Sequence, residues 1–68
     1  MRLLVKINDE KHEIYTQQYE VGLYVCRYKN NRMVEQFGVN DSEEEFIKNL
    51  EKSDDIEIIS KEGSFNLS

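Results

Sequence analysis

The chain has 68 residues, with nine lysines and arginines against 14 aspartates and glutamates, giving a net charge of −5 at pH 7. This length allows one small domain, and the acidic balance argues against nucleic-acid binding, which needs a clustered positive surface. A single cysteine excludes an internal disulfide and is typical of a reducing compartment, so we expect a cytoplasmic protein. The apolar residues 3–5 are too few for a secretory signal, and no run is long enough to span a membrane.

The negative charge is concentrated in one segment. Residues 41–57 carry a net charge of −6, whereas residues 1–40 carry a net charge of +1. A domain of this size buries only about 60% of its unfolded surface, so its stability is expected to be modest. Because the chain lacks the cysteines for a disulfide and a set of metal ligands, self-association is the remaining source of added stability.

Residues 1–8 alternate between apolar and polar side chains, which predicts a half-buried strand. Asp9 and Glu10 are expected to turn the chain into a second strand over residues 11–18. The predicted register places Val5 opposite Ile14, Leu4 opposite Tyr15, and Lys6 opposite Glu13. These apolar, aromatic and oppositely charged pairs support that register.

Residues 21–29 and 32–39 are predicted to form a second hairpin around Asn30-Asn31, because asparagine tolerates positive φ. The predicted pairing puts an aromatic set on one face: Tyr24, Tyr28, Met33 and Phe37, with Tyr24 opposite Phe37 and Tyr28 opposite Met33. The other face carries Leu23, Val25 and Val34 together with Arg27 and Gln36. Either face could pack on the core, and the sequence leaves the two alternatives equal.

A helix is predicted to begin after Ser42, which forms a capping box with Glu45, and to end near Ser53. Phe46, Ile47 and Leu50 form its apolar stripe. Residues 55–60 are predicted to form the last strand, in which Ile56 and Ile58 share one face. The predicted fold class is therefore α+β: a small, mostly antiparallel sheet of about five strands, in the order β-β-β-β-α-β, with one helix packed on one face. Residues 1–62 are expected to form one domain, and residues 63–68 a loose tail whose Phe65 and Leu67 could dock.

No group of residues predicts catalysis, and we expect neither an enzyme nor a bound cofactor, metal ion or small molecule. His12 has no partners suited to acid–base chemistry and is expected to be a solvated histidine in a turn. Cys26 lies in the middle of a predicted strand, where a buried and inert thiol is the usual case.

Three surfaces are candidates for binding. The candidate interaction surface consists of Tyr24, Tyr28, Met33 and Phe37. The candidate acidic helix surface consists of Glu44, Glu45 and Glu51. A weaker candidate is the basic hairpin tip formed by Arg27, Lys29 and Arg32, where nucleic-acid contact is not favoured because the chain is acidic overall.

Lysine, glutamate, asparagine and isoleucine are abundant, while proline and tryptophan are absent. In this composition and in its size the chain resembles the small uncharacterised proteins encoded by prophages and phages of AT-rich Gram-positive bacteria. The resemblance covers the whole chain but includes no motif, so it carries over no functional residue. It implies a regulatory or host-modulating role.

These observations predict a small non-enzymatic protein-interaction module that forms a homodimer, through a hairpin face or a sheet edge, or binds another protein. Tyrosine suits such a surface because it combines apolar area with a polar tip. The alternative function is an acidic decoy that binds a basic DNA-handling host protein in place of nucleic acid. Its basis is the charge of residues 41–57, although Lys48 and Lys52 interrupt the run of carboxylates.

Overall fold

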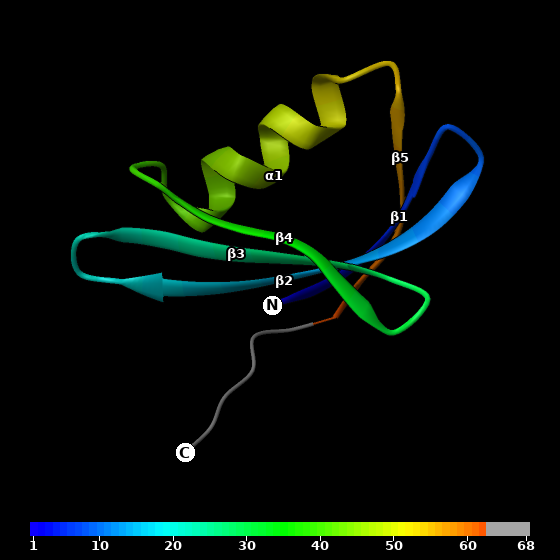
Figure 1. The fold of residues 1–68 in the computed structure, drawn as a ribbon. Helices are drawn as coiled ribbons and strands as arrows, with labels where there is room; N and C mark the ends of the chain where they lie inside the picture. The colour runs from blue at the N-terminus through cyan, green and yellow to red at the C-terminus, as the bar shows by residue number, and fades with distance from the viewer. Residues whose placement is uncertain (63–68) are drawn as a thin grey trace.

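The computed structural model describes residues 1–62 and contains one antiparallel sheet of five strands and one helix (Figure 1). The elements are β1 (Arg2–Ile7), β2 (Glu10–Tyr19), β3 (Gly22–Lys29), β4 (Arg32–Val39), α1 (Glu43–Lys52) and β5 (Ile56–Glu62). The strand order across the sheet is β4-β3-β2-β1-β5, so β4 and β5 form its two edges. The predicted α+β class and element order are confirmed, whereas the predicted tail, residues 63–68, lies outside the described residues.

The first hairpin turns one residue earlier than predicted. Asn8 and Asp9 have positive φ values of 52° and 68°, which asparagine and aspartate tolerate better than the glutamate of the predicted turn. Val5 therefore lies opposite His12 rather than Ile14, and the predicted register is wrong by two residues. A shift of two preserves the side of the sheet on which each residue lies, so the predicted faces of these strands are unchanged.

The second hairpin turns where predicted but contains a bulge that the sequence did not reveal. Asn30 and Asn31 have φ values of 54° and 64°, and Tyr28 lies opposite Met33 as expected. The register then shifts by one residue, since Val34 has no partner of its own on β3. The remainder of β4 is consequently turned over, and the predicted Tyr24–Phe37 pair is wrong.

The core lies between α1 and one face of the sheet. Its buried side chains come from β1, β2, β3 and α1, and they are Leu3, Val5, Ile14, Leu23, Val25 and Ile47. Leu23 and Val25 are each 1% exposed, so their face of the second hairpin is the inner one. This decides between the two alternatives: the face of Tyr24 and Tyr28 is the outer one.

α1 is held by its cap and by two contacts with β2. The Ser42 hydroxyl accepts a hydrogen bond from the Glu45 N–H at 3.2 Å, which confirms the serine half of the predicted capping box. The Glu43 N–H donates to Gln18 Oε1 at 2.9 Å, and Thr16 Oγ1 donates to Glu43 Oε2 at 3.2 Å. The N-terminus of α1 is thereby fixed over β2, and the predicted apolar stripe of the helix faces the sheet.

Candidate interaction face

The sheet face opposite α1, called here the open face, is covered by no other element of residues 1–62 (Figure 1). Because side chains alternate along a strand, the register assigns each residue of the sheet to one of its two faces. An aromatic half extends over β2, β3 and β4, and it comprises Tyr15, Tyr24, Cys26, Tyr28, Met33 and Gln36. A charged half extends over β5, β1 and β2, and it comprises Arg2, Lys6, Lys11, Glu13, Glu57 and Glu62.

The aromatic half is organised around two tyrosines from neighbouring strands. The rings of Tyr15 and Tyr28 lie edge to face, with centroids 5.4 Å apart and planes at 82°. Together with Glu13, Cys26 and Asn31 they line a shallow hollow of about 390 Å³. The hollow is a depression in this part of the open face into which a side chain of a partner can fit.

The hydroxyls of Tyr24 and Tyr15 already have partners within the chain. The Tyr24 hydroxyl donates to Gln36 Oε1, across the β3–β4 pair. The Tyr15 hydroxyl donates to Glu13 Oε2 at 2.9 Å. Burying these rings against another surface therefore leaves neither hydroxyl unsatisfied, which removes one common cost of burying tyrosine.

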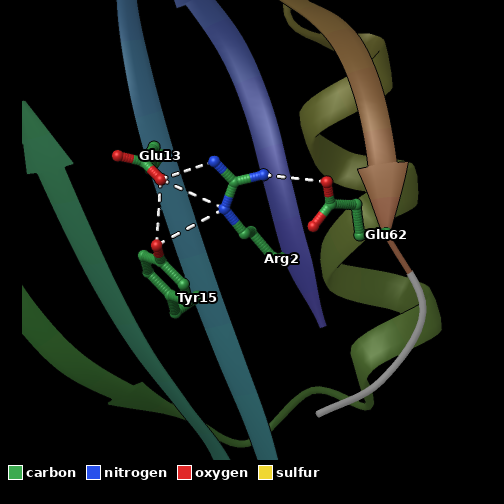
Figure 2. Close-up of polar contacts among 4 residues, drawn as sticks. All are labelled: Arg2, Glu13, Tyr15 and Glu62. Carbon is green, nitrogen blue, oxygen red and sulfur yellow. Dashed lines mark hydrogen bonds and ion pairs between the residues drawn. The ribbon is translucent and has the colours of Figure 1, made fainter.

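Arg2 joins three strands in the charged half, as Figure 2 shows. Its guanidinium donates to Glu13 Oε2 from Nη2 at 2.7 Å and from Nε at 3.1 Å. Nε also lies 3.4 Å from the Tyr15 hydroxyl, on the same side as Glu13. On the other side of the guanidinium, Nη1 lies 3.0 Å from Glu62 Oε1. The contacts with Tyr15 and Glu13 raise the pKa of Arg2, while hydrogen bonds from Arg2 and Tyr15 lower the pKa of Glu13. Arg2 is therefore positively charged and Glu13 negatively charged at neutral pH, and the cluster links β5 and β1 to β2.

Three of the four residues of the candidate interaction surface lie on the open face, and Phe37 does not. Tyr24, Tyr28 and Met33 share that face, whereas the bulge places Phe37 opposite Val25 on the helix side. There the Phe37 ring lies 6.5 Å from that of Phe46 in α1. Whether the three remaining residues bind anything stays a prediction.

The contribution of β1 and β2 to this surface was not predicted from the sequence. Tyr15, Arg2 and Glu13 join the face of Tyr24 and Tyr28 only once the β2–β3 register is known. The side chains of β1 and β2 alternate along each strand, and this alternation does predict that each strand has a polar and aromatic face opposite its apolar face. The pattern within the first hairpin does not show how β2 pairs with β3, so it does not place these residues beside Tyr24 and Tyr28.

The acidic helix surface is partly neutralised by lysines. Glu44 lies 3.8 Å from Lys48 on the same helix, and Glu51 lies 3.0 Å from Lys61 of β5. Glu45 has no ion pair within residues 1–62, and its backbone N–H serves the cap. Glu45 is thus the one carboxylate of this surface without a lysine partner in the described chain, and whether the surface binds a basic protein stays a prediction.

The basic hairpin tip is paired in a similar way. Arg27 Nη2 lies 2.8 Å from Glu35 Oε2, and Lys29 forms an ion pair with Glu10. Hydrogen bonding and charge attraction from Lys29 lower the pKa of Glu10. Arg32 alone among the three cations has no ion pair with any residue of the described chain. The tip thus has one unpaired charge to offer a partner.

His12 is not a solvated turn residue, and that prediction is wrong. Because the turn lies at Asn8-Asp9, His12 falls inside β2 opposite Val5 and is only 6% exposed. Its Nδ1 lies 3.0 Å from Arg27 Nη1, and since arginine can only donate, Nδ1 accepts. Burial, followed by the positive charges of Arg27 and Lys29, lowers the pKa of His12. The imidazole is therefore neutral in the folded protein and serves as a buried acceptor.

No helix within residues 1–62 is long and apolar enough to cross a membrane. In the same residues no group of three or more histidine, cysteine, aspartate or glutamate side chains is placed to hold a metal ion. Cys26 is a free thiol and half-buried on the open face, rather than fully buried as predicted. No protein-family model matches the chain, and neither does any curated protein or solved structure.

Proposed function

We propose that this protein is a non-enzymatic interaction module that self-associates through its open face. The observation that carries the proposal is a sheet face that no other element of residues 1–62 covers, which bears tyrosines and has no net charge, on a chain whose net charge is −5. The compositional resemblance to small prophage proteins favours a regulatory role for such a module.

The distribution of charge favours a second copy as the occupant of the open face. Its three cations and three carboxylates balance, so the whole excess negative charge lies elsewhere on the molecule. Two copies that meet through their open faces place α1 and its acidic residues on opposite outer sides of the pair. Repulsion between the chains is then small, because the excess charges are separated by two layers of sheet.

The tyrosines supply the contact area. Aromatic side chains dominate interface energetics, and tyrosine loses little conformational entropy when it is immobilised. Tyr24 is 37% exposed although it lies in an inner strand of the sheet. Its hydroxyl and that of Tyr15 are already paired, so both rings can be covered without losing a hydrogen bond.

The size of the open face sets the expected strength of association. Five strands about 4.8 Å apart and about 25 Å long give a face of about 600 Å². Specific interfaces bury roughly 600–1,000 Å² on each partner, so one open face lies at the lower limit. We therefore expect a dimer that dissociates on dilution within the micromolar range.

Light scattering after size-exclusion chromatography, over a range of concentrations, tests this proposal. We expect the mass to rise with concentration, and the double variant Tyr24→Ala, Tyr28→Ala to remain smaller than the wild type. Val21→Ala is the matched control, because Val21 is 89% exposed but lies in the β2–β3 turn, outside the open face. Circular dichroism confirms that each variant is folded. If the folded tyrosine variant assembles as the wild type does, the open face is not the contact surface.

A further inference from the structure

The edge strand β4 is open to pairing along its outer side. It has β3 on one side and no strand of residues 1–62 on the other, and seven of its eight residues are exposed. From Glu35 to Val39 its register with β3 is regular, so five consecutive residues present an unbroken backbone edge. Its one carboxylate, Glu35, is already paired with Arg27. An exposed and regular stretch such as Glu35–Val39, which has no unpaired charge and no proline, is a template for another strand.

The other edge of the sheet has a shorter regular stretch and carries more charged residues. A bulge at Ile59 divides β5 into two runs of three paired residues, whereas the bulge at Val34 leaves five consecutive paired residues on β4. It also carries Glu57, Lys61 and Glu62, and charged side chains and bulges are the usual means by which proteins block edge pairing. Within residues 1–62, β5 is thus better protected against edge pairing than β4.

The charges at the two ends of β4 indicate which strand fits beside it. Arg32 begins the strand, and Asp41 follows two residues after its end. Neither has an ion pair with another residue of the described chain. An antiparallel neighbour must therefore present a negative end to Arg32 and a positive end to Asp41, and a second β4 does both.

We propose that β4 pairs antiparallel with β4 of a second copy, joining two sheets into one of ten strands. A two-fold axis perpendicular to the sheet keeps both α1 helices on one side and both open faces on the other. The joined open face measures about 1,200 Å², twice the area of a single one. That exceeds the roughly 600–1,000 Å² per partner of a standard interface, which a single open face only just reaches.

If the open face also self-associates, as the proposed function states, two ten-stranded sheets stack through their joined open faces. This stacking rests on the proposed function, whereas the β4 pairing does not. The closed product is a tetramer with the helices outside. The edge contact and the face contact involve different residues, so they can be broken separately.

The test compares Val34→Lys with Ile59→Lys by light scattering on the full chain. Both side chains are exposed, at 48% and 42%, and both changes place a lysine on a sheet edge, but only Val34 lies on β4. We expect the wild type and Ile59→Lys to reach a tetramer, and Val34→Lys to stop at a dimer. If Val34→Lys assembles as the wild type does, the edge proposal is overturned. If instead Tyr24→Ala, Tyr28→Ala leaves assembly unchanged while Val34→Lys reduces it, the edge contact stands and the face contact of the proposed function fails.

Charge reversal and amide exchange provide readouts that do not depend on Val34. Arg32→Glu or Asp41→Lys alone replaces attraction by repulsion at two symmetric positions and should weaken the edge contact about tenfold, while the double reversal restores it. Hydrogen exchange of the amides of Glu35–Val39 should slow as the wild type is concentrated, and should not slow in Val34→Lys. Failure of the double reversal to restore assembly, or amides that exchange freely in the assembled wild type, overturns the edge pairing.

Discussion

Gly22 is the position where one added methyl group should damage the fold most. It begins β3 with φ at 151°, a conformation that residues with a side chain rarely adopt. A Cβ there would lie 2.6 Å from the backbone oxygen of Val39, which is too close for a nonbonded contact. Gly22→Ala must therefore strain its own backbone and displace the end of β4 where Leu23 pairs with Val39.

The expected cost follows from these two effects. A residue forced into a sparsely populated region of φ and ψ costs about 1–3 kcal/mol, and a weakened ladder hydrogen bond costs about 1 kcal/mol. The total of about 2–4 kcal/mol is a large part of the stability of a domain this small, which is about 3–10 kcal/mol at 0.05–0.15 kcal/mol per residue. At about 4–8 °C per kcal/mol, Tm should fall by about 8–32 °C.

Thermal unfolding followed by circular dichroism measures this cost, with all proteins at one concentration because self-association itself raises Tm. Gly38→Ala is the matched control, since its Cβ would meet no atom closer than 3.8 Å and its φ is ordinary. We expect Gly38→Ala to lie within about 0.5 kcal/mol of the wild type. A Gly22→Ala protein as stable as the Gly38→Ala protein would refute the packing described at this end of β3 and β4.

Two further predictions concern His12 and the cap of α1. The pKa of His12 is lowered on folding, so the unfolded chain takes up a proton first as the pH falls. The free energy of unfolding should therefore decrease as the pH drops below about 6.5. His12→Gln should reduce this pH dependence, measured by urea unfolding at pH 5–7. The lowered pKa values of Glu10 and Glu13 also reduce stability as the pH falls, but only below about pH 4.5. If His12→Gln leaves the pH dependence of stability between pH 5 and 7 unchanged, the neutral, buried imidazole is contradicted. Ser42→Ala should cost about 1 kcal/mol and Ser42→Gly only a few tenths, measured by urea unfolding, because the hydroxyl caps the Glu45 N–H. Equal stability of Ser42→Ala and the wild type would show that the cap contributes nothing.

The elements that local chemistry specifies were predictable from the sequence. Asn30-Asn31 forms the expected turn, because both residues tolerate the positive φ that a two-residue hairpin requires. Ser42 caps the helix, and Phe46, Ile47 and Leu50 face the core, because their spacing follows the helical period. In each case a few neighbouring residues determine the outcome.

The predictions that were wrong depend on how single residues pair between neighbouring strands. Asn8-Asp9 and Asp9-Glu10 are both polar dipeptides, and choosing the second moved the register by two residues without changing any face. The bulge at Val34 was more serious, since one unpaired residue moved Phe37 from the outer face to the helix side. No local pattern in β4 marks that bulge, because its inner and outer residues are equally mixed in polarity.

The candidate interaction face was predictable only in part for the same reason. Tyr24 and Tyr28 alternate within one strand, so their shared face follows directly from the period of two. Tyr15 and Arg2 reach that face through pairings between separate hairpins, which no alternation within a strand determines. The choice of the inner face also required knowledge of where α1 packs.

The reaction rate of the Cys26 thiol with a soluble disulfide reagent, measured against protein concentration, tests the central claim most directly. Cys26 is a half-buried free thiol on the open face, between the strands that carry Tyr15 and Gln36, so a second copy on that face must shield it. The account predicts that the rate falls as the protein is concentrated from the low micromolar range, in parallel with the rise in mass. A rate that stays constant while the mass rises would show that the chains associate elsewhere, and a constant rate and mass would show that the open face remains uncovered.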